Sequence, residues 1–354
     1  MLEKEKNLTI NDIAAMAGVA KSTVSEVINN NQKLRVSQKT FEKVRQIIEK
    51  YNYIPQDSAR ALSTKRTYQI GFLVSSRVTL GLSNSYFSTI ESGVSKACKE
   101  HGYQMVVSTY DLSTIKDFVM PEKLRRRSVD GIVIAGAIDQ AVLKLIKLLN
   151  IPYIVFGWSD DDNVLSLKYD IVSTYVRIME YLYGLNHRRI CISYYYDTSK
   201  EDYLVALKKF NDSLTVKDFS LLCLPAVGDD EFENGRDFAT EWLTLPAGER
   251  FTAFCGNDQS CCGFLAAINR ASVKCPGEIS IISGCNSALC QWNSQPVTAV
   301  NQKSYESGYI AADSLISLLD NKKSLAEVKE ILRRQCKPLE LIIRDTTGQA
   351  PVFK

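Results

Sequence analysis

From Tyr68 onward, short uncharged segments alternate with helix-like segments along nearly the whole chain. Segments such as QIGFLVS and GIVIAG carry no charge, which is typical of strands buried on both faces of a parallel sheet. About ten strand–helix units follow one another, more than one ordinary domain contains. The pattern is interrupted at a polar stretch near Asp160–Lys168. It therefore predicts two α/β lobes, and such lobes commonly bind ligands at the carboxyl ends of their strands.

Periodicity also predicts the individual elements of this region. The expected strands are QIGFLVS, QMVVST, GIVIAG, YIVFG, RICISYY, SLLCLP, TAFCG and ISIIS. The expected helices are one that ends at Glu100 and others near Pro121–Arg127, Ala141–Leu149, Ser173–Gly184, Asp202–Asp212, Phe232–Leu243 and Gln259–Ala271.

Ahead of this region, Thr9–Asn30 has the pattern of two short helices joined by a turn. Thr9 or Asn11 can cap the first helix, and Gly18 can end it in the left-handed conformation. Ser22 or Thr23 is expected to start the second helix, whose polar face holds Lys21, Ser22, Ser25, Glu26 and Asn29. Such a helix fits one that reads base edges in DNA, and it also fits an ordinary helical hairpin.

A third helix is expected over Ser37–Tyr51, with an apolar stripe at every third or fourth residue. The stripe can complete a small three-helix core, so residues 1–55 form a candidate domain. Pro55 then breaks the helix. The following basic segment, 56–67, has only Ala59 and Leu62 as hydrophobic points. It is either a flexible linker or a helix that a partner orders, with Leu62 wedged into a minor groove.

Charge is unevenly distributed. Residues 1–66 hold 12 Lys and Arg against 7 Asp and Glu, a net of +5, and the remainder of the chain carries a net of −2. A basic head suits contact with phosphates, although a solvated N-terminus is the simpler alternative. MLEKEKNL lacks the apolar core of a secretory signal, and no apolar run is long enough to span a bilayer. We expect a cytoplasmic protein with no membrane contact.

The residues give little support for catalysis or a metal site. The ten cysteines are irregularly spaced without a CxxC pair, so we expect reduced core residues, with Cys261–Cys262 as the one candidate redox pair. His101 and His187 belong to no Ser/His/Asp or metal-ligand arrangement. No Gly-rich phosphate loop follows the first strand of the body. We expect neither an enzyme nor a cofactor.

The order of these parts strongly resembles the LacI/GalR family of bacterial transcription regulators. The resemblance is carried by LTINDIAAMAGVAKSTVSEVINN, VSQKTFEKVRQIIEKYNYIP, ARAL and IGFLV. It continues through SNSYF, VDGIVIAG, IPYIVFG, GLNHRRI, FCGND and QPVTAVNQ. So many landmarks in one order are far more specific than a lone helix-turn-helix.

The resemblance implies an all-α helix-turn-helix head plus two doubly wound α/β lobes of periplasmic-binding-protein type. One lobe would combine about 68–168 with 301–330, and the other about 169–300 with 331–354, joined by three crossovers. The family further implies a homodimer, sometimes a tetramer, that binds a pseudo-palindromic double-stranded DNA operator in the nucleoid. A small molecule in the interlobe cleft, with a sugar or phosphosugar favoured, would control it. A soluble binding protein or sensor without a DNA role is the alternative.

By this resemblance, the DNA-binding side chains belong to the head and the hinge. They are Thr9, Asn11, Lys21, Ser22, Thr23, Ser25, Glu26, Asn29, Ala59 and Leu62. Glu26 stands where relatives often carry Arg. It either accepts a hydrogen bond from cytosine N4, which predicts a distinct operator preference, or pairs with a neighbouring Lys or Arg.

The effector residues implied by the resemblance are Arg77, Ser83, Phe87, Trp158, Asp170 and Asp258. The Arg that sugar-binding relatives usually carry is absent from DTSKEDYLVAL, whereas Asp258 stands where an acid commonly binds sugar hydroxyls. Trp158 can stack on a sugar ring or pack between lobes. Arg77 and Lys168 suit an acidic effector if they meet in the cleft, and are a solvated pair otherwise. The sequence does not choose between an inducer and a corepressor.

Overall fold

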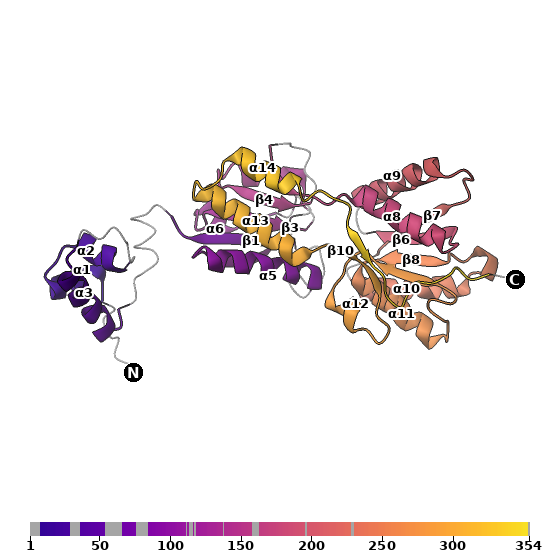
Figure 1. Cartoon of the computed structure of the whole chain (residues 1–354), viewed down its shortest axis with the longest axis horizontal. Coiled ribbons are helices and arrows are strands. Elements are labelled where there is room, and N and C mark those ends of the chain that lie inside the picture. The colour runs from indigo at the N-terminus through magenta and orange to yellow at the C-terminus, as the bar shows by residue number, and fades with distance from the viewer. Residues whose placement is uncertain are drawn as a thin grey trace. The chain divides into compact units, whose positions relative to one another are not determined.

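The computed structural model describes residues 8–28, 36–53, 66–75, 84–110, 112, 116, 118–136, 138–157, 163–194, 197–227 and 230–352. The chain divides into two units, a head over Met1–Tyr68 and a body over Gln69–Lys354, each of which is described by itself (Figure 1). No helix in these described ranges is long and apolar enough to cross a membrane.

The described part of the head holds three helices around a small core. They are α1 (Ile10–Ala17), α2 (Lys21–Ile28) and α3 (Gln38–Lys50). All three contribute buried side chains, which are Ile13, Ala14, Ala17, Val24, Val27 and Val44. Partly buried residues such as Phe41 and Ile47 pack around them. The apolar stripes read from the sequence therefore meet in one core, as expected.

The ends of these helices follow from local chemistry. Thr9 caps α1 in a reciprocal box with Asp12: its backbone N–H donates to Asp12 Oδ2 at 2.7 Å, and its hydroxyl accepts from the Asp12 N–H at 3.4 Å. Gly18 ends α1 at φ 64°, the left-handed conformation predicted for it. The expected start of α2 at Ser22 or Thr23 was wrong. The helix begins at Lys21 because the Ala20 carbonyl already accepts the first helical bonds.

The first lobe of the body is a five-stranded parallel sheet in the order β2-β1-β3-β4-β5. Its strands are β1 (Gln69–Ser75), β2 (Gln104–Tyr110), β3 (Gly131–Ala135), β4 (Tyr153–Phe156) and β5 (Leu165–Leu167). Its helices are α5 (Ser85–Glu100), α6 (Glu122–Arg125), α7 (Gln140–Lys147), α13 (Ser304–Leu319) and α14 (Leu325–Arg333). Strand β5 lies inside the stretch expected to be a polar loop. Its three residues are too short for periodicity to separate from a loop.

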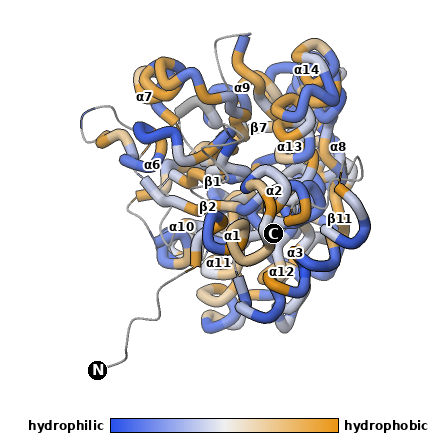
Figure 2. Tube along the Cα trace, turned by 90° about the vertical axis from the view of Figure 1, so that its left-hand side faces the viewer, coloured by the Kyte–Doolittle hydropathy of each residue, from blue (hydrophilic) through white to orange (hydrophobic). Residues whose placement is uncertain are grey.

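The second lobe is a six-stranded sheet in the order β11-β10-β9-β8-β6-β7, parallel except for β11. Its strands are β6 (Arg189–Tyr194), β7 (Ser220–Pro225), β8 (Ala253–Gly256), β9 (Ser280–Ser283), β10 (Thr298–Asn301) and β11 (Glu340–Ile342). Its helices are α8 (Ile171–Gly184), α9 (Asp197–Ser213), α10 (Glu231–Thr244), α11 (Asp258–Arg270) and α12 (Ala288–Trp292). Helices cover both faces of each sheet (Figure 1), and orange and blue alternate along many helical tubes in Figure 2, as expected for amphipathic helices.

Both lobes have the same strand order: the second strand of the lobe lies outside the first, and the third lies on the first strand's other side. This is a doubly wound order, so the predicted fold class is confirmed. The chain passes between the sheets three times, at 168–170, 302–303 and 334–339. Helix α14 packs on α13 and β5, so the first lobe continues to Arg333, slightly beyond the expected boundary near 330.

Two helix pairs in the body pack backbone against backbone through glycines. A Cβ added to Gly93 of α5 would lie 2.0 Å from the Tyr305 carbonyl oxygen of α13, and one added to Gly308 would lie 2.1 Å from the Ile90 carbonyl oxygen. Gly235 of α10 and Gly263 of α11 are equally crowded against each other's helices. These glycines therefore set how closely the helices approach.

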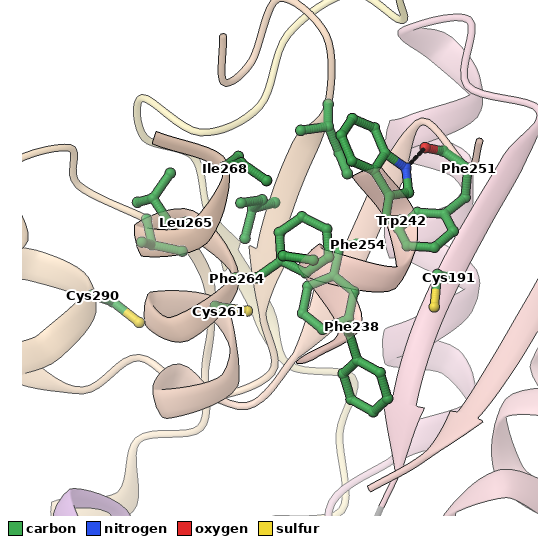
Figure 3. Close-up of a cluster of buried hydrophobic side chains, with 14 of the residues drawn as sticks. Cys191, Phe238, Trp242, Phe251, Phe254, Cys261, Phe264, Leu265, Ile268 and Cys290 are labelled. Atoms are coloured by element: carbon green, nitrogen blue, oxygen red, sulfur yellow. Dashed lines mark hydrogen bonds between the residues drawn. The ribbon is translucent and has the colours of Figure 1, made fainter. Parts of the chain in front are cut away.

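The core of the second lobe between its sheet and α10 and α11 is aromatic (Figure 3). Phe254 of β8 stacks on Phe264 of α11 with ring centroids 4.4 Å apart. The buried indole of Trp242 donates its N–H to the Phe251 carbonyl at 2.9 Å, so its one polar atom is satisfied. This core fixes α10 and α11 over the sheet, which places the first residue of each helix.

Candidate functional site

The polar face of α2 is open to solvent while its apolar face is buried. Lys21 and Ser22 are exposed, and Thr23, Ser25 and Glu26 are half-buried. Val24 and Val27 are buried in the head's core. A short helix packed in this way leaves its N-terminal end, which begins at Lys21, and its polar side chains accessible to a partner. This is the geometry of a helix that enters a DNA major groove.

Two of the predicted DNA contacts belong to the start of α1. Thr9 has its hydroxyl engaged with Asp12 Oδ2 at 2.7 Å, so it has a capping role of its own. Asn11 does not cap the helix and is exposed. Glu26 forms no ion pair with a Lys or Arg within the described part of the head. Asn29, Ala59 and Leu62 lie outside the described residues.

In the body, two buried serines mark equivalent points of the two lobes. Ser75 ends β1 and Ser193 stands one residue before the end of β6, the first strand of each lobe. Neither hydroxyl has a hydrogen-bond partner among the described residues, although the two residues are only 0% and 7% exposed. Ligands of doubly wound sheets bind where the first and third strands diverge. Both orphaned hydroxyls therefore lie at the expected ligand position.

A glycine at the end of each third strand keeps this position open. A Cβ on Gly136, after β3, would lie 2.9 Å from Ser75 Cβ. One on Gly256, which ends β8, would lie 3.0 Å from Ser193 Oγ. The ring of Phe87 reaches the same place in the first lobe, 3.5 Å from the Cβ position of Gly136, and is 6% exposed. Phe87 was predicted to bind effector, and the structure places it at the switch point.

Asp258 joins the two lobes. It is the first residue of α11 and is 2% exposed. Its Oδ2 accepts a hydrogen bond from the Ser85 hydroxyl of α5 at 2.7 Å, and its Oδ1 accepts from the Gln259 N–H at 3.0 Å. The second predicted acid, Asp170, caps α8 through a bond from the Ser173 N–H at 2.9 Å. Of the predicted effector residues, Arg77, Ser83 and Trp158 lie outside the described residues.

Sequence reasoning missed Glu231, the first residue of α10. Burial, followed by the nearby charge of Asp258, raises its carboxyl pKa from 4.5 to about 7, although a hydrogen bond from Asn257 opposes the shift. Its Oε2 atom is buried and accepts no hydrogen bond from the residues that the structure describes. The only sequence signal was an acid at a helix start, which is common at any helix N-terminus.

Other polar groups converge near these acids. Cys285, which follows β9, is buried, and its thiol pKa is raised by burial and by the charges of Asp258 and Glu231. Gln302 donates from Nε2 to the Gly284 carbonyl at 2.6 Å, while its Oε1 has no partner within the described ranges. Tyr169, between the lobes, donates to Ser307 Oγ at 3.0 Å. The arrangement can bind a small polar ligand, with no nucleophile–base pair among the described residues to do chemistry on it.

The thiols of the second lobe are poorly suited to redox chemistry. Burial raises the pKa of Cys262 to about 11 and that of Cys261 well above its usual range. A thiol held protonated is a weak nucleophile. The described residues contain ten free cysteines and no group of three or more potential metal ligands. The structure favours the core-residue interpretation of the Cys261–Cys262 pair.

Comparison with known proteins decides the family. Residues 9–56 match the model of bacterial regulatory proteins of the lacI family, and residues 179–347 match a periplasmic binding protein-like domain. The chain belongs to the LacI family. It thus combines the family's DNA-binding helix-turn-helix domain with a periplasmic-binding-type effector domain.

Several relatives of this LacI-family protein are similar over most of their length. The ribose operon repressor of Escherichia coli is 28% identical over 87% of this chain and 92% of its own. The transcriptional repressor PurR of Photobacterium profundum is 27% identical over 94% and 99%. Catabolite control protein A of Staphylococcus epidermidis is 27% identical over 89% and 94%. The named relatives are regulators rather than enzymes.

A solved structure extends the likeness to the whole fold. The structure of the lac repressor dimer bound to operator and the anti-inducer ONPF superposes with a TM-score of 0.77, covering 97% of this chain and 100% of that one. The two are 23% identical in sequence, so this likeness establishes the shared architecture alone.

Proposed function

We propose that this LacI-family protein is a repressor that binds a pseudo-palindromic DNA operator as a homodimer and responds to a small molecule bound between its lobes. Residues 1–55 would be the DNA-binding domain, 56–67 the hinge helix and linker, and 68–354 the effector-binding and dimerisation domain. It would act in the cytoplasm, where the chromosome lies. This proposal includes no catalytic step.

The observation that carries the proposal is the pairing of two sites in one chain. The open polar face of α2 fits a major groove, and the buried orphaned hydroxyls of Ser75 and Ser193 fit a ligand at the switch points of the two lobes. A ligand that binds one lobe arrangement better than another shifts the equilibrium between them, which is what couples such a site to DNA affinity. The operator-bound lac repressor dimer, which shares the fold, supports the DNA and dimer parts.

Selection of bound sequences from random double-stranded DNA tests the DNA part with the full chain at fixed salt. A pseudo-palindrome is expected, because a two-fold dimer reads two half-sites. Substituting Lys21→Ala and Ser22→Ala together should lower affinity for the selected site, while Lys99→Ala in the body should not. Recovery of no preferred sequence, or of a single unrepeated half-site, contradicts the proposal.

A further inference from the structure

The acids Glu231 and Asp258 start two neighbouring helices whose backbones are in contact. A Cβ on Gly235 of α10 would lie 2.0 Å from the Ser260 carbonyl oxygen of α11, so the two helix starts are brought close together. The charge of Asp258 contributes to the raised pKa of Glu231, which shows that the two carboxyl groups interact electrostatically. The contact between α10 and α11 at these glycines places the two acids near each other, and this contact does not depend on the protonation of the carboxyl groups.

Within the described ranges, the two acids have no cationic partner. No Lys or Arg among the described residues forms an ion pair with either carboxylate. Arg344, a cation of the same lobe, is instead engaged by the Val297 carbonyl at 2.6 Å and by Asn286 Oδ1 at 2.6 Å. Within the described part of the chain, Asp258 accepts from the Ser85 hydroxyl and the Gln259 N–H, both uncharged donors, and Glu231 Oε2 accepts from none. A buried acid beside a half-buried one is unfavourable without a cation unless something neutralises the charge.

Ser193 points independently to a ligand at this place. Its hydroxyl is buried, with the residue 7% exposed, and has no hydrogen-bond partner in the part of the chain that the structure describes. Side chains alternate along β6, and Cys191 belongs to the core that α10 and α11 cover, so Ser193 faces the same side of the sheet. Its Oγ lies 3.0 Å from the Cβ position of Gly256, two residues before Asp258. An unsatisfied hydroxyl therefore faces the region where both acids begin their helices.

We propose that the effector of this protein carries a protonated amine, which the carboxylates of Glu231 and Asp258 bind together. This inference rests on the proposed function, because it names the ligand class of the same interlobe site. The ammonium group donates to Glu231 Oε2 and neutralises the repulsion between the acids. The orphaned Ser193 hydroxyl and Gln302 Oε1 are available to further polar groups of the ligand.

The negative charge of the two acids favours an amine over the other candidate ligands. A neutral polyol can donate hydrogen bonds to both acids but leaves two like charges uncompensated whenever Glu231 is ionised. A phosphorylated or carboxylated ligand adds further negative charge to the described site, which costs several times as much in a poorly solvated place as in water. An acidic effector, favoured by the alternative in which Arg77 and Lys168 face the cleft, is thus an outcome against this inference.

Calorimetric titration of the full-length protein tests the inference with matched pairs of probes. Glucosamine is compared with glucose, galactosamine with galactose, and ethanolamine with ethylene glycol, with glucose 6-phosphate as the anionic probe. At least one amine is expected to bind tenfold or more tightly than its hydroxyl partner. The pKa of Glu231 is raised to about 7, so amine binding near pH 7 should also release a proton from this carboxyl group. The released proton makes the measured binding enthalpy depend on the ionisation enthalpy of the buffer.

Two substitutions on α10 give the matched control. Glu231→Gln should weaken amine binding tenfold or more and abolish the proton release. Glu233→Gln should change neither, because Glu233 is exposed and pairs with Arg236 on its own helix. Circular dichroism confirms that both variants fold. Equal affinities within every pair, tighter binding of glucose 6-phosphate, no amine binding, or full amine affinity in E231Q each overturn the inference.

Operator binding separates this inference from the proposed function. If the protein selects a palindromic operator and responds to glucose or glucose 6-phosphate, the proposed function stands and the amine inference is wrong. If the protein binds glucosamine but selects no operator, the amine site stands and the proposed regulatory function is wrong.

Discussion

The hydroxyl of Ser85 donates to Oδ2 of Asp258 across 2.7 Å, and the two residues belong to different lobes. Each is the first residue of its helix, α5 and α11, so this bond ties the two helix starts together. A hydrogen bond to a carboxylate contributes about 1.5–3 kcal/mol when the groups are shielded from water. It favours lobes that stay in contact at this point.

Replacing Ser85 with alanine should therefore loosen the junction. Amide hydrogens at both helix starts, including those of Tyr86 and Gln259, should exchange faster in Ser85→Ala, because each is fixed by a side-chain acceptor beside this bond. Ser92→Ala is the control, since the exposed Ser92 hydroxyl donates to the Ser88 carbonyl of its own helix. Hydrogen exchange with mass spectrometry checks this; identical exchange in both variants would contradict it.

A methyl group at Gly93 or Gly308 should destabilise the body. The added Cβ would overlap a backbone oxygen of the opposite helix at 2.0 or 2.1 Å, and backbone cannot rotate away. Separating α5 from α13 should cost about 1–3 kcal/mol or more. Gly184→Ala at the end of α8 should be neutral or slightly stabilising, because nothing lies within 4 Å of its Cβ position. Urea unfolding distinguishes the three variants.

Acidification should weaken the second lobe through His187. The ring is fully buried, bonded to Thr252 Oγ1 at 2.8 Å and the Gly348 carbonyl at 3.1 Å, and burial lowers its pKa. The unfolded chain takes up the proton first, at about pH 6.5. The contribution of neutral His187 to the free energy of unfolding is thus fully present above that pH. It falls as pH drops toward the folded-state pKa, by at most about 1.4 kcal/mol per pH unit.

Only two histidines occur in the chain, so a pair of variants isolates His187. Protonation of Glu231, whose carboxyl pKa is raised to about 7, stabilises the folded chain over the same pH range, so the two variants are compared with each other. Relative to His101→Gln, which keeps His187, the variant His101→Gln combined with His187→Gln should be less stable at pH 7.5 and should lose less stability, or gain more, between pH 7.5 and 5.5. Equal pH slopes in the two proteins would rule out His187 as the source.

Glu26 should influence which base pair the head prefers. Its side chain is half-buried on α2 without an ion pair to the described residues, so it is available to accept from cytosine N4. Glu26→Arg should change the preferred base at one position of each half-site, with discrimination altered by about 1–3 kcal/mol. Glu42→Arg on α3 makes the same charge change and should tighten binding to all sequences alike. Unchanged base preference in E26R would refute the base-reading role.

Local patterns predicted much of the fold. Gly18 ends α1 because a left-handed position favours glycine, and the polar Ser37 caps α3. Uncharged runs such as GIVIAG became central strands. Patterns failed where an element was short or polar. The three residues of β5 have too few positions to show a period, and α9 begins at Asp197 in a polar turn without an apolar face.

The candidate site was less predictable because its parts come from distant segments. Asp258 was identified by resemblance, but its partner Ser85 lies 173 positions away. Glu231 could not be told from any other acid at a helix start, because its environment depends on the approach of α10 to α11 at Gly235 and Gly263, a tertiary contact. The orphaned hydroxyls of Ser75 and Ser193 likewise become meaningful only when the strand order is known.

The glycine contact between α5 and α13 also constrains how the protein is made. Gly93 leaves the ribosome long before Gly308, and at about 5–20 residues per second roughly 10–40 s separate them. During that time the backbone face of α5 has no partner, while the second lobe still awaits β11. Neither lobe can be completed as an N-terminal unit ahead of the other. The nascent chain therefore carries a first sheet without α13 and a second sheet without β11 until its C-terminal segments emerge, so the two lobes are completed nearly together.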